Sequence, residues 1–249
     1  VKRATPDGKA KWAAGFAPAS ERSATRGGPF KRAFDRQAVL VYGTQGTPRE
    51  NAWARAKALF DAQTFAYRGN GGFEVMSDVA YLEALALPAK RHGNSPIWAL
   101  SDRNVILYGN RDTHALWARY VPDNAPIDVA RGKVTARKAS GEVCVSNGEG
   151  LVCVAVVPGP GKTLAGLVAP TGDAGGVVAN RLPFFLSGAG FPDYLVLDAR
   201  MLSDAQGKGT GGVIGAGFFD RTWQIPSFAD EGAFWEAPAS AVTPSSKAP

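Results

Sequence analysis

The sequence predicts an α/β domain with a mostly parallel, Rossmann-like or flavodoxin-like sheet and flanking helices on both faces. Short, uninterrupted apolar runs recur along the chain, as in strands that are buried on both faces. The runs alternate with turns and helix-forming segments, which is the pattern of parallel sheets. The expected strands of this kind cover residues 38–42, 104–108, 163–169 and 194–197.

The overall composition is close to the globular norm, with 45% hydrophobic and 20% charged residues among 249. Local changes in composition indicate where the folded domain begins and ends. Residues 1–27 are polar and basic and are expected to form a linker into an α/β domain over residues 28–236. Residues 237–249 are rich in Ala, Pro, Ser and Thr and are expected to be a disordered tail. The polar start at Val1 indicates a mature fragment or an excised piece of a longer protein.

The net charge of +6 raises the question of an anionic partner. The basic residues do not gather on a predicted helix or sheet, and the chain has neither aromatic RNA-binding patches nor zinc-finger spacing. Nucleic-acid binding is therefore not expected. No run of about 18 apolar residues occurs, so no membrane span is expected either.

The first strand is followed by the strongest helix signal in the chain. Thr47 is expected to cap the helix, Pro48 to start it, and Glu50 to complete a capping box. The helix is expected to run to about residue 68, where a glycine-rich stretch stops it. Five residues spaced by three or four are expected to face the sheet: Trp53, Ala56, Phe60, Thr64 and Tyr67.

The same arrangement of strand, loop and helix is expected a second time. Its strand covers residues 104–108 and its helix about residues 114–120. Trp53 and Trp117 occupy similar places in the two units, and each precedes Ala-Arg. A true repeat and convergent packing both explain this likeness. The remaining expected elements are a strand over residues 73–76, helices over 78–87 and 174–186, and a last strand over 213–219.

A β-rich insertion is expected near residues 128–160. Within it, Cys144 and Cys153 would face each other across a hairpin, with Cβ atoms about 4.5–5.5 Å apart. A disulfide, which would fit an oxidising compartment, and two reduced thiols both remain open. The sequence Gly159-Pro-Gly-Lys-Thr163 resembles the end of a phosphate-binding loop, but Val156 stands where that motif needs glycine. A hairpin turn is therefore predicted there.

Self-contained nucleophilic catalysis is not expected. The only histidines are His92 and His114, and no Gly-x-Ser-x-Gly motif occurs. His114 is expected in the first turn of a helix, where the helix dipole would lower its pKa and favour a neutral donor, although a plain surface position is the commoner case. No metal site and no cofactor are expected, because neither histidine has a spaced partner.

The loops that follow the expected strands over residues 38–42 and 104–108 are the best candidate binding site. In an open α/β sheet, ligands bind at the carboxyl ends of strands, and helix N-termini there favour anions. Asn110 and Arg111 are the more plausible anion contacts, because the capping box adds the negative charge of Glu50 to the first loop. Two well-capped helices without a ligand are the competing interpretation. The candidate residues are Gly43, Thr44, Thr47, Asn110, Arg111 and Thr113.

Six blocks of the sequence carry a resemblance: residues 28–34, 39–54, 67–71, 103–110, 181–187 and 215–219. They resemble a region found at the C-terminal end of large bacterial hydrolases of the prolyl-oligopeptidase-like α/β hydrolase type. The resemblance spans about residues 28–223. It implies a parent serine hydrolase, a peptidase or esterase, that is exported to the periplasm or outside the cell, with its catalytic domain upstream. It implies no catalytic residue in this segment.

Two functions therefore remain as hypotheses. In the first, the chain is a non-catalytic accessory domain that packs on the upstream hydrolase domain of the same polypeptide and shows an exposed apolar patch when isolated. In the second, it binds a small molecule or anion through the strand-end loops and has a concave pocket near Thr44, Asn110 and Arg111.

Overall fold

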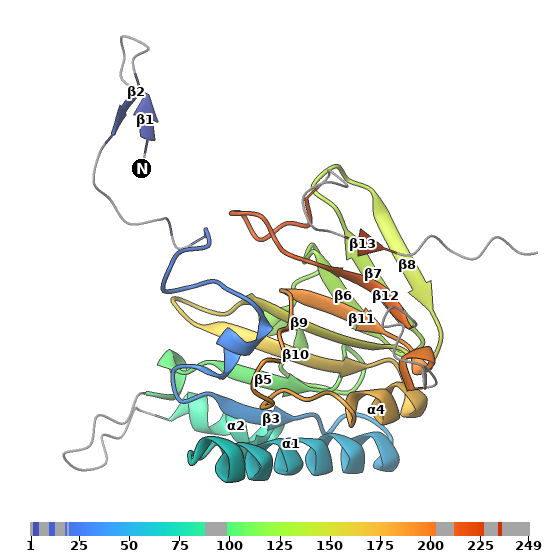
Figure 1. Cartoon of the computed structure of the whole chain (residues 1–249). Coiled ribbons are helices and arrows are strands. Elements are labelled where there is room, and N and C mark those ends of the chain that lie inside the picture. Colours follow the sequence, from blue (N-terminus) through green and yellow to red (C-terminus); the bar gives the residue numbers. More distant parts are fainter. Residues whose placement is uncertain are drawn as a thin grey trace, which may run out of the picture.

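The computed structural model describes residues 2–4, 10–12, 18, 20–87, 99–202, 212–226 and 234–235. These residues form an α/β structure with an eight-stranded mixed sheet and a three-stranded antiparallel sheet (Figure 1). A separate antiparallel pair is made by β1 (Lys2–Ala4) and β2 (Ala10–Trp12). His92 and the expected tail over residues 237–249 lie outside the described residues.

One half of the large sheet is parallel, in the strand order β10-β5-β3-β4. Its central strands are buried along almost their whole length, which confirms the prediction made from the apolar runs. The elements of this half are β3 (Val39–Tyr42), α1 (Pro48–Gly69), β4 (Glu74–Ser77), α2 (Asp78–Ala86), β5 (Val105–Tyr108) and β10 (Leu164–Pro170).

The other half of the sheet is antiparallel, so the expected mostly parallel sheet is not confirmed and a Rossmann-like order is not evident. The cause is local, because β9 and β10 are joined by the short turn at Gly159–Thr163 and such a turn can connect only antiparallel strands. The hairpin turn predicted there is confirmed. The strands that extend the sheet are β9 (Val152–Pro158), β11 (Tyr194–Leu197), β12 (Val213–Gly217) and β13 (Phe234–Trp235).

The three-stranded sheet contains β6 (Ile127–Ala130), β7 (Lys133–Arg137) and β8 (Val143–Asn147). The expected cysteine hairpin is wrong, because β8 pairs with β7 whereas β9 belongs to the large sheet. Cys144 and Cys153 are both free thiols in this structure. Burial raises the pKa of Cys153, which keeps it a thiol. The cysteines therefore add no support for an oxidising compartment.

Helix α1 begins as predicted, but it turns a different face to the sheet. Its capping box is present, with the Thr47 hydroxyl accepting from the Glu50 amide and the Glu50 carboxylate accepting from the Thr47 amide. Of the expected stripe, Phe60 is 56% and Tyr67 90% exposed. The buried residues are Ala54, Lys57, Ala58 and Asp61. A search for apolar spacing misses this face because half of it is charged.

The remaining helical segments are short. The helix expected over residues 174–186 ends at Ala179, and the one expected from residue 114 is a single turn that starts at Trp117. None of the helices in the described part of the chain has the length and apolar character needed to cross a bilayer. The short helical segments are η1 (Phe30–Phe34), η2 (Leu100–Asp102), α3 (Trp117–Tyr120), α4 (Asp173–Ala179) and η3 (Ala199–Leu202).

The end of the expected linker packs on the body of the domain. Arg22 forms an ion pair with the buried Asp193 at 2.8 Å. Arg26 is itself buried and donates to the carbonyl of Gly159 at 2.8 Å. Two basic residues of the expected linker, Arg22 and Arg26, therefore hold this segment in place.

Candidate functional site

The carboxyl ends of β3, β4 and β5 meet at one edge of the large sheet. From β3 the chain passes through α1 to β4 on one side, and then returns through α2 to β5 on the other side. This reversal makes a topological switch point between β3 and β5, the place where α/β sheets commonly bind ligands. The loops that carry the candidate residues follow these two strands.

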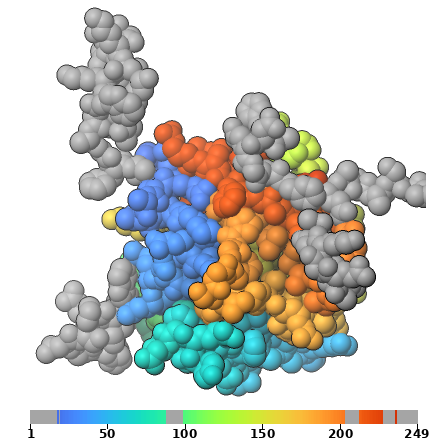
Figure 2. Space-filling view, in the orientation of Figure 1, coloured from blue at the N-terminus to red at the C-terminus, as the bar shows by residue number. Residues whose placement is uncertain are grey.

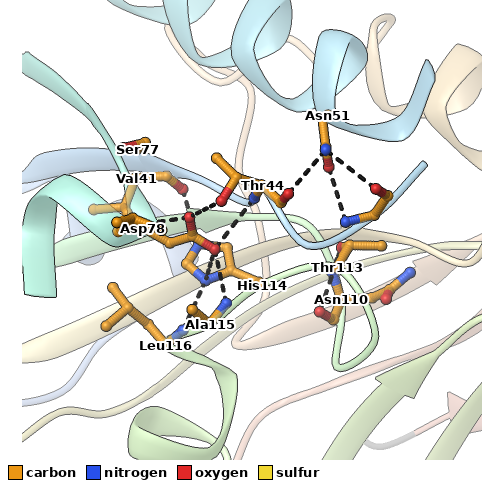
Figure 3. Close-up of polar contacts among 12 residues, drawn as sticks. Val41, Thr44, Asn51, Ser77, Asp78, Asn110, Thr113, His114, Ala115 and Leu116 are labelled. Atoms are coloured by element: carbon orange, nitrogen blue, oxygen red, sulfur yellow. Dashed lines mark hydrogen bonds and ion pairs between the residues drawn. The ribbon is translucent and has the colours of Figure 1, made fainter. Parts of the chain in front are cut away.

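Asp78 lies at the centre of this edge. It is the first residue of α2, directly after the helix cap Ser77, and its side chain is fully buried. Its carboxylate accepts from the Thr44 hydroxyl at 2.6 Å and the Thr44 amide at 3.2 Å, and from the amides of Val79 at 2.9 Å and Ala115 at 2.7 Å (Figure 3). One carboxylate thus ties together the chain segments that follow β3, β4 and β5.

His114 lies beside this carboxylate and is also buried (Figure 3). Its Nδ1 accepts from the Leu116 amide at 3.1 Å, so its Nε2 carries the proton and donates to the Val41 carbonyl at 3.1 Å. Burial lowers its pKa from 6.5 to about 4, while Asp78, 3.9 Å away, opposes this shift. The expected helical surface position is therefore wrong. The ring is the expected neutral donor, but burial rather than a helix dipole makes it so.

The free energy of unfolding is expected to fall by about 3 kcal/mol as the pH is lowered from 6.5 to 4, because of His114 alone. The folded state has the lower pKa, so between these values the unfolded chain binds more protons and acid favours unfolding. Urea unfolding at several pH values measures this slope. His114→Gln should flatten it, and an unchanged slope in that variant would contradict the assignment.

The loops after β3 and β5 interlock. A Cβ atom at Gly43 would collide with the carbonyl of Thr113, so only glycine allows the two backbones to approach this closely. The hydroxyl of Thr113 accepts from the Asn110 amide at 2.8 Å. Asn51, from α1, donates to the carbonyl of Thr44 at 2.9 Å (Figure 3). The loops therefore hold each other rather than standing apart.

Asn110 and Arg111, the expected anion contacts, have partners within the chain. The Asn110 amide group donates to the carbonyl of Pro170 at 2.8 Å and accepts from the Asp112 amide at 2.9 Å. Arg111 forms an ion pair with Asp128 at 2.9 Å and a longer one with Asp123 at 3.6 Å. The charge that was expected to attract an anion is thus balanced by two carboxylates.

The pocket that remains at this edge is small and acidic. Its volume is about 20 Å³, room for roughly one water molecule. Glu50 contributes a carboxylate whose pKa is lowered to about 2, chiefly by its hydrogen bonds with Arg131. Asp173 contributes a second carboxylate to the lining. The lining residues are Glu50, Trp53, Gly109, Asn110, Thr113, Pro170, Gly172 and Asp173.

A second polar cluster lies inside the domain and was not among the expected site residues. Lys57 and Asp61 are one turn apart on the buried face of α1, and their side chains form an ion pair at 2.7 Å. The hydroxyl of Tyr108, from β5, donates to the other oxygen of Asp61 at 2.9 Å. Burial raises the pKa of Asp61, and the Lys57 ammonium opposes that shift.

The only sequence signals for these groups are positional. Asp78 directly follows a strand, at the edge of the sheet where ligand-binding residues of α/β proteins commonly lie. Lys57 and Asp61 have helical i,i+4 spacing, which also describes exposed pairs.

Among the described residues, no three His, Cys, Asp or Glu side chains come together in a way that could hold a metal ion. The sequence matches no protein-family model and no curated protein.

Proposed function

We propose that this chain is a non-catalytic accessory domain that packs on the catalytic domain of an exported serine hydrolase, a peptidase or esterase, within the same polypeptide. The observation that carries the proposal is the closure of the strand-end edge. Thr44, Asn110 and Arg111 all bond to other parts of the chain. The resemblance over residues 28–223 supplies the class of the partner and its export.

Closure of this edge supports a structural role over ligand binding there. A site of about 20 Å³ is far below the roughly 300–1,000 Å³ of ordinary small-molecule pockets. The pocket lining also supplies no cation to hold an anion, and its two carboxylates are already ion-paired, Glu50 with Arg131 and Asp173 with Arg49. The alternative, in which the strand-end loops bind an anion or small molecule, therefore gains no support from the geometry.

The edge strand β8 is the surface best suited to docking. Among the described residues, β8 pairs with β7 alone, so its outer edge carries backbone groups without a strand partner. Val143 is 54% and Val145 39% exposed on the same face of β8, and the strand contains neither charge nor proline. Isolated domains normally protect such edges with charges or prolines, so this edge suits burial against a neighbouring domain.

The first test is the reading frame that encodes this chain, read upstream of Val1. The proposal expects a Gly-x-Ser-x-Gly motif there, with Asp or Glu and His completing a triad. Produced as one polypeptide, that protein should hydrolyse ester or peptide substrates. A reading frame without a serine hydrolase domain would overturn the proposal.

The second test locates the contact by hydrogen–deuterium exchange. Amides of β8 should exchange more slowly in the longer polypeptide than in this chain alone, because a partner covers them. Val143→Lys with Val145→Lys should remove that protection, whereas Val177→Lys on α4, where the valine is 53% exposed, should not. Equal exchange of β8 in both proteins would rule out this surface.

A further inference from the structure

A cavity of about 210 Å³ lies between α1 and the segment that follows α4. Figure 2 shows that segment, in orange, lying against α1, in cyan and teal. The cavity is on a different part of the molecule from the strand-end edge, since none of its lining residues lines the small acidic pocket. The volume suits a ligand smaller than the drug-sized molecules that fill pockets of about 300–1,000 Å³.

Aromatic and aliphatic side chains form much of the cavity wall. Phe60, Phe184, Phe185 and Leu186 all contribute to it. Phe60 lines the cavity although it is 56% exposed, so part of its ring is open to solvent. This wall would accept the apolar body of a ligand.

Positive charge gathers around the same cavity. Arg68 and Arg181 both line it, both are exposed, and neither guanidinium has a hydrogen bond or ion pair with any part of the chain that the structure describes. Lys57 lies just behind the wall, with its ammonium 4.9 Å from the ring centre of Phe184 and 5.4 Å from that of Phe60.

The only carboxylate in the lining is already neutralised. Asp61 lines the cavity but accepts from the Lys57 ammonium through one oxygen and from the Tyr108 hydroxyl through the other. The charged groups at the cavity are therefore two exposed guanidinium groups and one internally balanced ion pair. The guanidinium groups are the donors that best match carboxylate and phosphate oxygens.

We infer that this cavity is a binding site for a small organic anion with an apolar body, such as an aromatic carboxylate. Arg68 and Arg181 hold the charged group, and the phenyl rings of Phe60 and Phe184 contact the body of the ligand. This site needs neither a hydrolase partner nor the strand-end loops, so it stands or falls independently of the accessory role.

Titration of the full chain with phenylacetate, followed by calorimetry, tests the site. We expect saturable binding of one molecule per chain, with acetate and benzyl alcohol each at least about 10-fold weaker, because each keeps only one half of the recognised chemistry. Raising the salt concentration should weaken phenylacetate binding, since both arginines are exposed.

Variants assign the site. Arg68→Gln and Arg181→Gln should each weaken phenylacetate binding by about 10-fold or more, as expected for a lost charge-assisted hydrogen bond. Arg55→Gln is the matched control, because Arg55 is exposed on the same helix but does not line the cavity. All three positions are on the surface, so folding should be unaffected. Absence of saturable binding, or equal binding by the two variants and the control, would overturn the inference.

Discussion

Asp78→Ala is expected to lower the free energy of unfolding by about 3–5 kcal/mol. The Asp78 carboxylate is fully buried and accepts four hydrogen bonds, three of them from backbone amides. Removing it leaves these donors without a partner in a space that a methyl group cannot fill, and each unsatisfied buried group costs about 1–3 kcal/mol. Urea unfolding followed by circular dichroism measures the loss.

Two further substitutions separate this network from a general effect of lost charge. Asp78→Asn keeps one accepting oxygen but turns an NH₂ group toward amide donors, so it should also be strongly destabilising. Asp123→Asn removes a carboxylate that is fully exposed, and should change stability by less than about 0.5 kcal/mol. If Asp78→Ala were as mild as Asp123→Asn, the three segments at the sheet edge would not depend on this carboxylate.

Local patterns predicted the parts of the fold that local chemistry determines. The capping box at Thr47 and Glu50 places the start of α1 correctly because each of its hydrogen bonds spans only three residues. The turn at Gly159–Thr163 is readable for the same reason. The apolar runs mark the central strands because a strand buried on both faces needs no polar residues.

Features that depend on distant partners were missed. Apolar runs do not encode strand order, so the antiparallel half of the sheet and the separation of Cys144 from Cys153 were not predictable from them. Charged side chains enter the core only where the fold supplies partners. The buried positions of Lys57, Asp61 and Asp78 thus follow from tertiary contacts that one sequence does not show.

Lys57→Met is expected to lower the free energy of unfolding by about 3–5 kcal/mol at neutral pH. Methionine has similar length and fills the space between Phe60 and Phe184, so the loss should come from electrostatics rather than from packing. Without the ammonium, Asp61 keeps only the hydrogen bond from Tyr108, and a buried carboxylate is left without a counter-charge. Thermal and urea unfolding of the variant and the unchanged protein give the difference.

The pH dependence of that difference identifies its cause. Burial already raises the pKa of Asp61, and loss of Lys57 should raise it further. A folded-state pKa above the unfolded value means that the folded variant binds the extra proton, so its deficit should shrink as the pH falls through the raised pKa. His114 titrates in both proteins and cancels in the comparison. A deficit that stayed constant with pH would point to packing instead.

Replacing the whole cluster should cost much less than breaking it. Lys57→Met, Asp61→Leu and Tyr108→Phe together remove both charges and the hydroxyl that would otherwise lose its acceptor. Apolar replacement of a complete buried ion pair is often neutral or stabilising by about 1–4 kcal/mol. The triple variant should therefore unfold with a free energy closer to that of the unchanged protein than to Lys57→Met. Such a result would mean that the fold can do without these charges, so stability alone would not explain their presence beside the cavity.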